Sequence, residues 1–136
     1  MSGLGQNAGA AGGAEPRAKQ VMVPALATVA PDVAVGAAHQ LLREHRATHV
    51  LVLDRGLLVG ILSQRDLLHA SSDALPVRDV MRRALFVVSP DTPVSRVALI
   101  FRRRRVPVLP VLDGRDLVGI VRAVDVLETA WDRAKP

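Results

Sequence analysis

Two polar side chains, Ser63 and Asp66, stand three residues apart where an apolar strand is expected to give way to a helix. At this spacing a hydroxyl and a carboxylate can form a capping box, in which each side chain bonds the backbone amide of the other residue. The same pair also suits a ligand, because a carboxylate can accept two hydrogen bonds from a cis-diol and a hydroxyl beside helix-start amides suits a phosphate. The spacing alone favours the capping interpretation.

The same pattern returns 59 residues later, where Gly119, Arg122 and Asp125 match Gly60, Ser63 and Asp66. Arg122 replaces the serine, so no box of this kind can form there, yet the aspartate remains. An acid in the first turn of a helix also suits the helix dipole. Arg122 has two possible roles, since it could contact a phosphate or fill the second site and close it.

The repeat extends through most of the chain. Residues 19–68 align with residues 78–127 without a gap, and 19 of the 50 aligned pairs are identical. An internal repeat in register outranks other sequence signals. Each half is too small to bury its apolar face alone, so we expect an α/β (α+β) fold in which two repeats pack with pseudo-twofold symmetry.

Each repeat is predicted to run strand, helix, strand, strand, helix. The turn residues of the two hairpins are Asp54-Arg55-Gly56 and Asp113-Gly114, since apolar runs around a short Asp- and Gly-containing loop indicate a hairpin. The second repeat has a strong helix start, with Thr92 as N-cap and Pro93 at the first helical position. The predicted elements span residues 27–30, 33–46, 50–53, 57–62 and 63–70 in the first repeat, and the helix from Thr92, 109–112, 117–121 and 124–133 in the second.

The chain divides by composition into four parts. Residues 1–18 are rich in Gly and Ala and are expected to form a disordered tail, because they cannot bury enough surface to offset their ordering entropy. The first repeat covers 19–70, a linker covers 71–76 and the second repeat covers 77–136. Trp131 is expected to pack near the end of the last helix.

Composition excludes several functional classes. The chain has no Cys, which excludes disulfides and thiolate metal sites and fits a reducing, cytoplasmic setting. Aromatic residues are only 2%, which argues against base-stacking platforms for single-stranded nucleic acid. No apolar run approaches a membrane span, and no nucleophile–base pair or Walker-type loop indicates an enzyme.

The order of motifs resembles the cystathionine beta-synthase (CBS) domain. The resemblance rests on a Pro-Asp pair before a helix, on Leu109-Pro110-Val111-Leu112-Asp113 and Leu117-Val118-Gly119-Ile120, and on an Asp in the first turn of the last helix. It covers about Lys19 to Leu127. Two copies in register resemble a Bateman module, and the chain is similar to a stand-alone CBS-pair protein.

The resemblance implies a non-enzymatic regulatory role. Tandem CBS pairs commonly bind adenosyl ligands (AMP, ADP, ATP or S-adenosylmethionine) between their repeats and often form dimers. A chain of this kind is expected to be a homodimer that senses an adenosyl nucleotide and modulates a separate, unidentified protein. No obligatory cofactor is implied.

The resemblance also implies which residues bind the ligand. In the family motif Gly-x-x-Ser/Thr-x-x-Asp, the aspartate bonds the ribose hydroxyls and the hydroxyl lies near the phosphate. Gly60, Ser63 and Asp66 fit this motif, while Arg122 departs from it beside Asp125. Further ligand-binding candidates are Thr48 and His49, where some members place phosphate contacts, and the first strands, which line the adenine pocket, at Thr28, Val29, Val87 and Val88.

Other charged residues receive weaker interpretations. His39, His45 and His49 lack a carboxylate placed to complete a metal site, so we expect no metal. The run Arg102–Arg105 is expected in the last turn of a helix, where cations suit the dipole. With a net charge of +5, a nucleic-acid binder is the third alternative, although adjacent residues point around a helix and not along one face. The second alternative is a ligand-free dimerisation or protein-interaction module.

Overall fold

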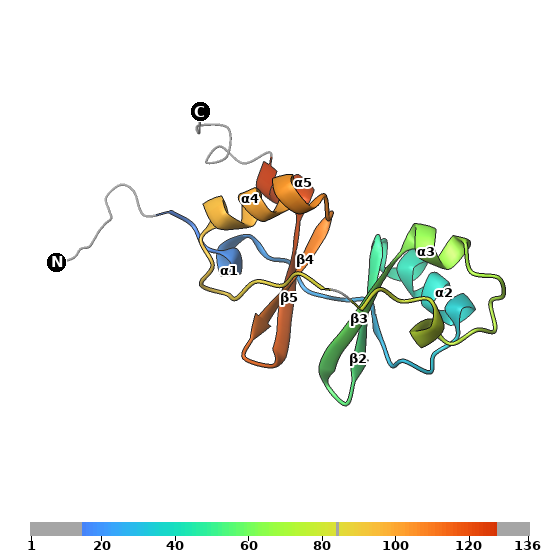
Figure 1. The fold of residues 1–136 in the computed structure, drawn as a ribbon. Coiled ribbons are helices and arrows are strands. Elements are labelled where there is room, and N and C mark those ends of the chain that lie inside the picture. The colour runs from blue at the N-terminus through green and yellow to red at the C-terminus, as the bar shows by residue number, and fades with distance from the viewer. Residues whose placement is uncertain (1–14, 84, 128–136) are drawn as a thin grey trace. The chain divides into compact units, whose positions relative to one another are not determined.

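A computed structural model describes residues 15–83 and 85–127 of the chain. Short elements alternate along it in the predicted order, except that a helical turn opens each repeat and the second repeat has no regular first strand (Figure 1). In chain order they are α1 (Ala18–Val21), β1 (Thr28–Val29), α2 (Val35–His45), β2 (His49–Asp54), β3 (Leu57–Ser63), α3 (Gln64–Leu68), a 3₁₀ turn (Val77–Asp79), α4 (Val94–Arg104), β4 (Val108–Asp113), β5 (Asp116–Arg122) and α5 (Ala123–Leu127).

The chain folds as two compact units. Of the described residues, the first unit comprises 24–83, 85–87 and 112–118, and the second comprises 15–23, 88–111 and 119–127. Each unit has its own cluster of buried apolar side chains, contributed almost entirely by Val, Leu and Ala. Apolar burial of this kind is the main term that stabilises each unit.

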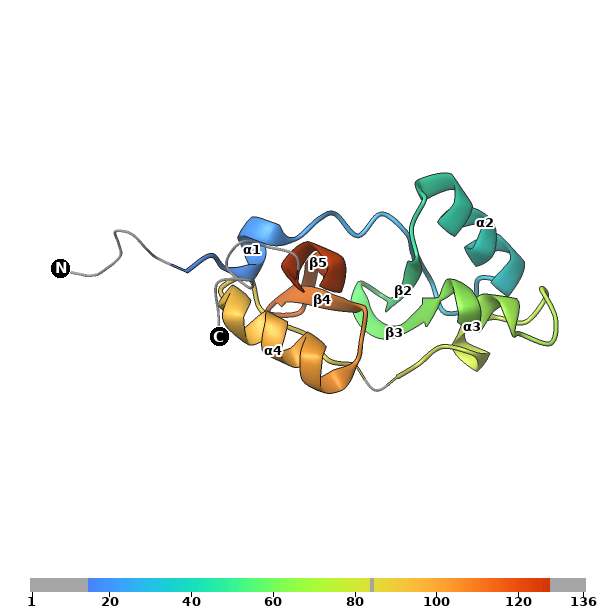
Figure 2. The same cartoon turned by 90° about the horizontal axis from the view of Figure 1, so that it is seen from above.

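The first unit is a three-stranded sheet covered by two helices. β1 pairs in parallel with β2, and β2 pairs antiparallel with β3. Helices α2 and α3 lie side by side against this sheet (Figure 1, Figure 2). Alternate strand residues Val50, Val52 and Leu62 are fully buried in the cluster that also holds Val35 and Leu42, so this face of the sheet is the core face.

The predicted hairpins are confirmed. The β2–β3 turn has positive φ at both Arg55 (53°) and Gly56 (83°), as a two-residue turn matching the strand twist requires. The β4–β5 turn has positive φ at Gly114 (63°). Asp and Gly were therefore reliable turn signals in both repeats.

The second unit lacks the regular first strand that its repeat predicts. Among the described residues of this unit, one parallel bridge forms, between Val88 and Val111, with Val88 N donating to Pro110 O at 3.0 Å. In the first unit Leu51 N donates to Ala27 O at 2.9 Å. The residue equivalent to Leu51 is Pro110, which has no N–H, so the ladder loses that bond.

The predicted start of α4 was wrong by one position. Pro93, with φ −61° and ψ 143°, occupies the N-cap position, and the helix begins at Val94. Thr92 does not cap it. Its Oγ1 instead accepts a hydrogen bond from Ser89 N at 3.0 Å, and its carbonyl accepts one from Ala18 N at 2.8 Å, so Thr92 is committed to the preceding turn.

The opening segment of each sequence repeat packs in the unit built mainly from the other repeat. Ala18 N donates to Thr92 O, and at the equivalent positions Val77 N donates to Val33 O, both at 2.8 Å. Ala18 and Val77 are both fully buried. Residues just after the linker, such as Val77, thus belong to the same unit as the first repeat, although they open the second repeat.

The chain ends fall partly outside the described residues. Of the predicted tail 1–18, residues 1–14 lie outside the described residues. Residues 15–18 are described, and Pro16 O accepts a hydrogen bond from Val94 N at 2.9 Å. The last helix is described as α5 to Leu127, so Trp131 and the predicted extension to residue 133 lie beyond the described part. Across residues 15–83 and 85–127, no helix has the length and apolar character needed to span a membrane.

Candidate functional site

The capping box predicted at the start of α3 is present. Ser63 Oγ accepts from Asp66 N at 3.1 Å, and Asp66 Oδ2 accepts from Ser63 N at 2.9 Å. Ser63 holds the extended conformation of an N-cap residue. The structural interpretation of this pair is therefore confirmed, and it leaves the other carboxylate oxygen, Oδ1, pointing to a different partner.

That partner is Arg82, which sequence reasoning missed. Arg82 Nη2 donates to Asp66 Oδ1 at 3.2 Å. The Asp66 side chain is only 18% exposed, whereas the Arg82 side chain is 70% exposed. Burial alone would raise the pKa of Asp66, but the hydrogen bonds from Ser63 and Arg82 outweigh it and hold that pKa below its ordinary value. Asp66 is thus an ionised, mostly buried acceptor.

Arg82 reaches this place through a backbone bridge to β3. Arg82 N donates to Ile61 O at 2.9 Å, and Ile61 N donates to Arg82 O at 3.1 Å. Arg82 follows the linker and belongs to the second sequence repeat, so its proximity depends on the exchange of opening segments. In the sequence, Arg82 is recognisable only as a basic residue directly after Met81. Its contact with Asp66 follows from the backbone bridge to β3.

The strand register places several candidates on one face of the first unit's sheet. Thr28 pairs with Leu51, Leu51 with Ile61, and Ile61 with Arg82, so these four side chains share a face. Two residues along β2, His49 pairs with Ser63 on the same face. We call this the ligand face, and we call His49, Ser63, Asp66 and Arg82 the Asp66 cluster.

His49 lies at the polar end of the ligand face. It is partly buried, and its Nδ1 lies 2.9 Å from Thr48 Oγ1. Burial lowers the pKa of His49, the charge of Asp66 acts to raise it, and the charge of Arg82 acts to lower it further. The net lowering favours the neutral imidazole at neutral pH. The charges of Asp66 and Arg82 both act on His49.

Two further predicted site residues lie on the core face. Val29 pairs with Val52, and Val52 pairs with Gly60. A methyl group placed on Gly60 would collide with Met81 Sδ and lie 2.8 Å from Met81 Cγ. Gly60 therefore allows close packing of Met81 against β3, and Val29 packs on the core cluster.

The second unit repeats the arrangement with different partners. Arg122 Nε and Nη2 donate to Asp125 Oδ2 and Oδ1 at 2.6 and 3.0 Å. Gly119 again faces a methionine, with Met22 Sδ 2.9 Å from an added methyl group. The bridge equivalent to that of Arg82 is made by Val23 with Ile120. Each aspartate thus has an arginine partner, supplied from a different position of the repeat.

Of the first-strand candidates in the second repeat, Val88 is buried in the second unit's core and Val87 is 42% exposed. Neither offers a polar side chain to a ligand. The structure therefore gathers Thr28, Thr48 and the Asp66 cluster in the first unit, and pairs Arg122 with Asp125 in the second.

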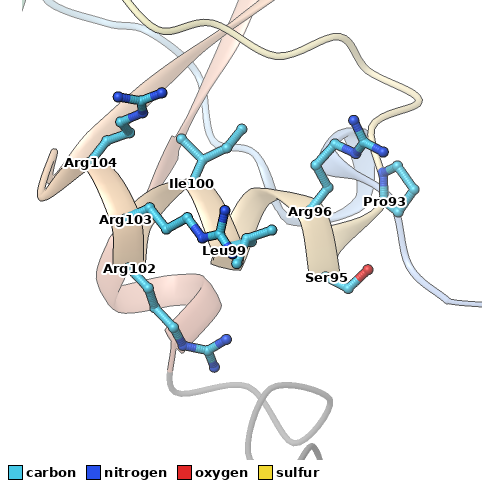
Figure 3. A pocket seen from close by; sticks show the side chains of 8 residues that line it. All are labelled: Pro93, Ser95, Arg96, Leu99, Ile100, Arg102, Arg103 and Arg104. Carbon is cyan, nitrogen blue, oxygen red and sulfur yellow. The ribbon is translucent and has the colours of Figure 1, made fainter.

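The basic run Arg102–Arg105 ends α4 as predicted, with Arg105 in the left-handed conformation (φ 53°). A groove of about 680 Å³ follows this helix, with Leu99 and Ile100 between Arg96 at one end and Arg102, Arg103 and Arg104 at the other (Figure 3). Figure 3 shows the three consecutive arginines pointing in different directions around the helix end. This spread fits a solvated helix end better than a single phosphate-binding face.

Within residues 15–83 and 85–127, no three His, Asp or Glu side chains are placed to hold a metal ion. The three histidines considered above lie in α2 and at the start of β2. His45 ends α2, His49 begins β2, and His39 Nδ1 lies 3.5 Å from Arg43 Nη1.

Comparison with known proteins agrees with the repeat. A family model described as the CBS domain matches residues 18–73 and again residues 77–132. Inosine-5'-monophosphate dehydrogenase of Korarchaeum cryptofilum is 32% identical over 111 residues, which are 81% of this chain and 23% of the enzyme. The chain therefore spans about a quarter of that relative's length.

Two solved structures share the fold. The CBS domain pair of protein MJ0100, in complex with 5'-methylthioadenosine and S-adenosyl-L-methionine, superposes with a TM-score of 0.78 at 25% identity, covering 90% of this chain and 100% of that one. CBSX2 in complex with AMP has a TM-score of 0.76 at 27% identity, covering 88% and 99% of the two chains.

Proposed function

The chain belongs to the CBS domain family as a tandem pair with the mixed α/β fold of that pair, and from this premise we propose that it is a non-enzymatic sensor of an adenosyl nucleotide. Structural relatives bind AMP or S-adenosylmethionine. The protein forms a homodimer, and binding of the ligand changes how this homodimer modulates a partner protein. The response is limited by the ligand's differential affinity for the two states of the sensor.

The observation that carries this proposal is the state of Asp66. Its side chain is 18% exposed, its pKa is held below the ordinary value, and its Oδ1 is bonded to an arginine whose side chain is itself 70% exposed. A cis-diol can donate to such a carboxylate while the arginine moves aside, because the guanidinium is solvated and water can replace Asp66 as its partner. A purely capping aspartate would not require this second partner.

The ligand face supplies the remaining contacts of the proposed complex. Leu51, which is buried, and Ile61, which is partly buried, lie between Thr28 at one edge and Arg82 at the other. The adenine ring packs against Ile61, with the Thr28 hydroxyl beside the edge of the ring. The ribose lies toward Asp66, and the phosphate lies toward Ser63 and His49. A mainly apolar surface with a few placed polar groups is typical of small-molecule sites.

A thermal-shift panel with AMP, ADP, ATP, S-adenosylmethionine and adenosine tests this function. A ligand at about 100 times its dissociation constant adds roughly 2.7 kcal/mol to the free energy of unfolding. For a chain of this size the shift in Tm is on the order of 10 °C. Asp66→Ala should lose the shift, measured against the variant's own unliganded Tm because the capping box is also lost.

Asp91→Ala is a matched control. Asp91 also has an ion pair, with Lys19 Nζ at 3.2 Å, but its side chain is 75% exposed and lies in the second unit. This variant should keep the full ligand shift. Tm values that respond to none of the ligands would overturn the proposal and favour the ligand-free interaction module. Affinity for RNA or DNA that falls steeply with salt would instead favour the nucleic-acid binder.

A further inference from the structure

Arg82 combines a fixed backbone with a solvated head. Two backbone hydrogen bonds hold it against Ile61, at 2.9 and 3.1 Å. Its side chain is 70% exposed and contacts Asp66 Oδ1 through Nη2 at 3.2 Å. A guanidinium carries five N–H donors in a planar fork. The anchoring point is therefore set by the sheet, while the head can change partners by rotation of the side chain alone.

Three of the backbone amides around the start of α3 are already committed to other acceptors. Ser63 N donates to Asp66 Oδ2 at 2.9 Å, Gln64 N to Thr48 O at 3.0 Å, and Asp66 N to Ser63 Oγ at 3.1 Å. An anion beside Ser63 would have to break the capping box or the anchor of α3 to use these donors. Binding the anion without that loss therefore needs a donor other than these three amides.

The charge of Asp66 also indicates that a bound phosphate needs a further, cationic donor. A phosphate near Ser63 stands close to the ionised carboxylate of Asp66, and like charges at short range repel each other. A neutral imidazole at His49 does not offset that repulsion. The Arg82 guanidinium already balances Asp66, and it forms strong, bidentate hydrogen bonds with phosphate oxygens.

We propose that Arg82 is the phosphate-recognising residue of the first unit's site, and that it makes this site select adenosine ligands carrying a 5'-phosphate over adenosyl ligands that carry none. This inference rests on the proposed function. When the ribose hydroxyls donate to Asp66, the Arg82 head turns to the phosphate. A ligand with a sulfonium cation in place of the phosphate places positive charge beside Arg82 and is disfavoured.

The second unit lacks this device. Val23 makes the equivalent bridge, with Val23 N to Ile120 O at 2.8 Å and Ile120 N to Val23 O at 2.9 Å. Its side chain has neither charge nor donor. The repeat thus keeps the backbone bridge at both places, and of these two bridge positions the first unit's carries a guanidinium.

The test compares AMP, adenosine and S-adenosylmethionine by isothermal titration calorimetry on the wild-type chain and on Arg82→Met, Arg82→Lys and Arg83→Met. Arg83 is the matched control, because it is the adjacent exposed arginine and donates to Arg78 O at 3.2 Å, away from Asp66. Arg82→Met should reduce the preference for AMP over adenosine about tenfold or more, the scale of hydrogen bonds to a charged group. Arg82→Lys should retain part of the preference, and Arg83→Met all of it.

The salt dependence gives a second readout. AMP affinity of the wild type should fall with ionic strength, and that of Arg82→Met should respond much less. Equal weakening of AMP and adenosine in Arg82→Met would assign Arg82 a structural role and overturn the inference alone. Unchanged AMP affinity in Arg82→Met, or tighter binding of S-adenosylmethionine than AMP by the wild type, would also overturn it. If the wild type binds none of the three ligands, both the proposed function and this inference are overturned.

Discussion

Arg122 engages both carboxylate oxygens of Asp125, with Nε 2.6 Å from Oδ2 and Nη2 3.0 Å from Oδ1. Asp66 in the first unit gives one oxygen to an arginine and the other to the Ser63 amide. Both carboxylates accept one hydrogen bond on each oxygen, but a single guanidinium holds both oxygens of Asp125, and its two parallel hydrogen bonds add geometric specificity. The two aspartates of the repeat are therefore not equivalent as ligand-binding groups.

We predict that the wild-type chain binds one adenosyl nucleotide and that Arg122→Ser creates a second site. The substitution restores the serine of the first repeat and removes the guanidinium from both oxygens of Asp125. Calorimetric titration should show about one ligand per chain before the change and about two after it. Because Val23 occupies the place of Arg82, the new site should bind adenosine and AMP equally well.

The double variant Arg122→Ser/Asp125→Ala is the control and should return the stoichiometry to one. Two ligands per wild-type chain, falling to one in Arg122→Ser, would show instead that Arg122 contacts the phosphate. Since the Arg122 side chain is 46% exposed, the loss of the ion pair should change the free energy of unfolding by less than about 1 kcal/mol. A larger loss would mean that the variant tests folding rather than binding.

The lowered pKa of Asp66 predicts a specific pH dependence of stability. The folded-state pKa lies below the unfolded value of about 3.9, so the folded state binds fewer protons between the two values. The stabilisation by ionised Asp66 is therefore fully present above the unfolded pKa and is lost as the pH falls through the folded pKa. Asp66→Asn should remove this contribution, about 1 kcal/mol at neutral pH.

Urea unfolding between about pH 7 and about pH 3 would measure this difference. The comparison belongs in a His49→Asn background, because His49 titrates in the same range and its pKa responds to the charge of Asp66. The free-energy difference between His49→Asn and His49→Asn/Asp66→Asn should shrink toward zero in acid. A difference that stays constant with pH would show that the ionisation of Asp66 contributes nothing to folding.

Local sequence signals predicted the elements, and topology supplied what they missed. The capping box of Ser63 and Asp66 follows from their spacing, and the turns follow from Asp and Gly, because these interactions join residues near in sequence. Arg82 could not be found this way. It reaches Asp66 only because residues that follow the linker cross to the unit formed by the first repeat.

Two smaller errors have the same origin. Thr92 has the right residue type for an N-cap, but its carbonyl is held by Ala18, which is far away in sequence. The first strand of the second repeat is reduced to the Val88 bridge because its neighbour contributes Pro110, which has no N–H. Gly60 matches a ligand-binding motif in sequence, yet its position on the core face is visible only from the strand register.

Gly60 offers the sharpest test of that packing role. Its backbone is one that alanine can adopt, but an added methyl group would overlap Met81 Sδ, lie 2.8 Å from Met81 Cγ and lie 3.1 Å from Met81 Cβ. Met81 cannot withdraw freely, because the adjacent Arg82 is bonded to Ile61 through its backbone. Gly60→Ala should therefore lower the free energy of unfolding by about 1–3 kcal/mol, the usual cost of overpacking.

A double-mutant cycle with Met81→Ala separates this clash from other causes. Met81→Ala alone should be destabilising, because it removes a partly buried side chain that packs on the first unit's core. In the double variant the new methyl group enters the vacated space, so the combined loss should be smaller than the sum of the two single losses by about 1 kcal/mol or more. Additive losses in urea unfolding would show that the clash with Met81 is not what Gly60 avoids.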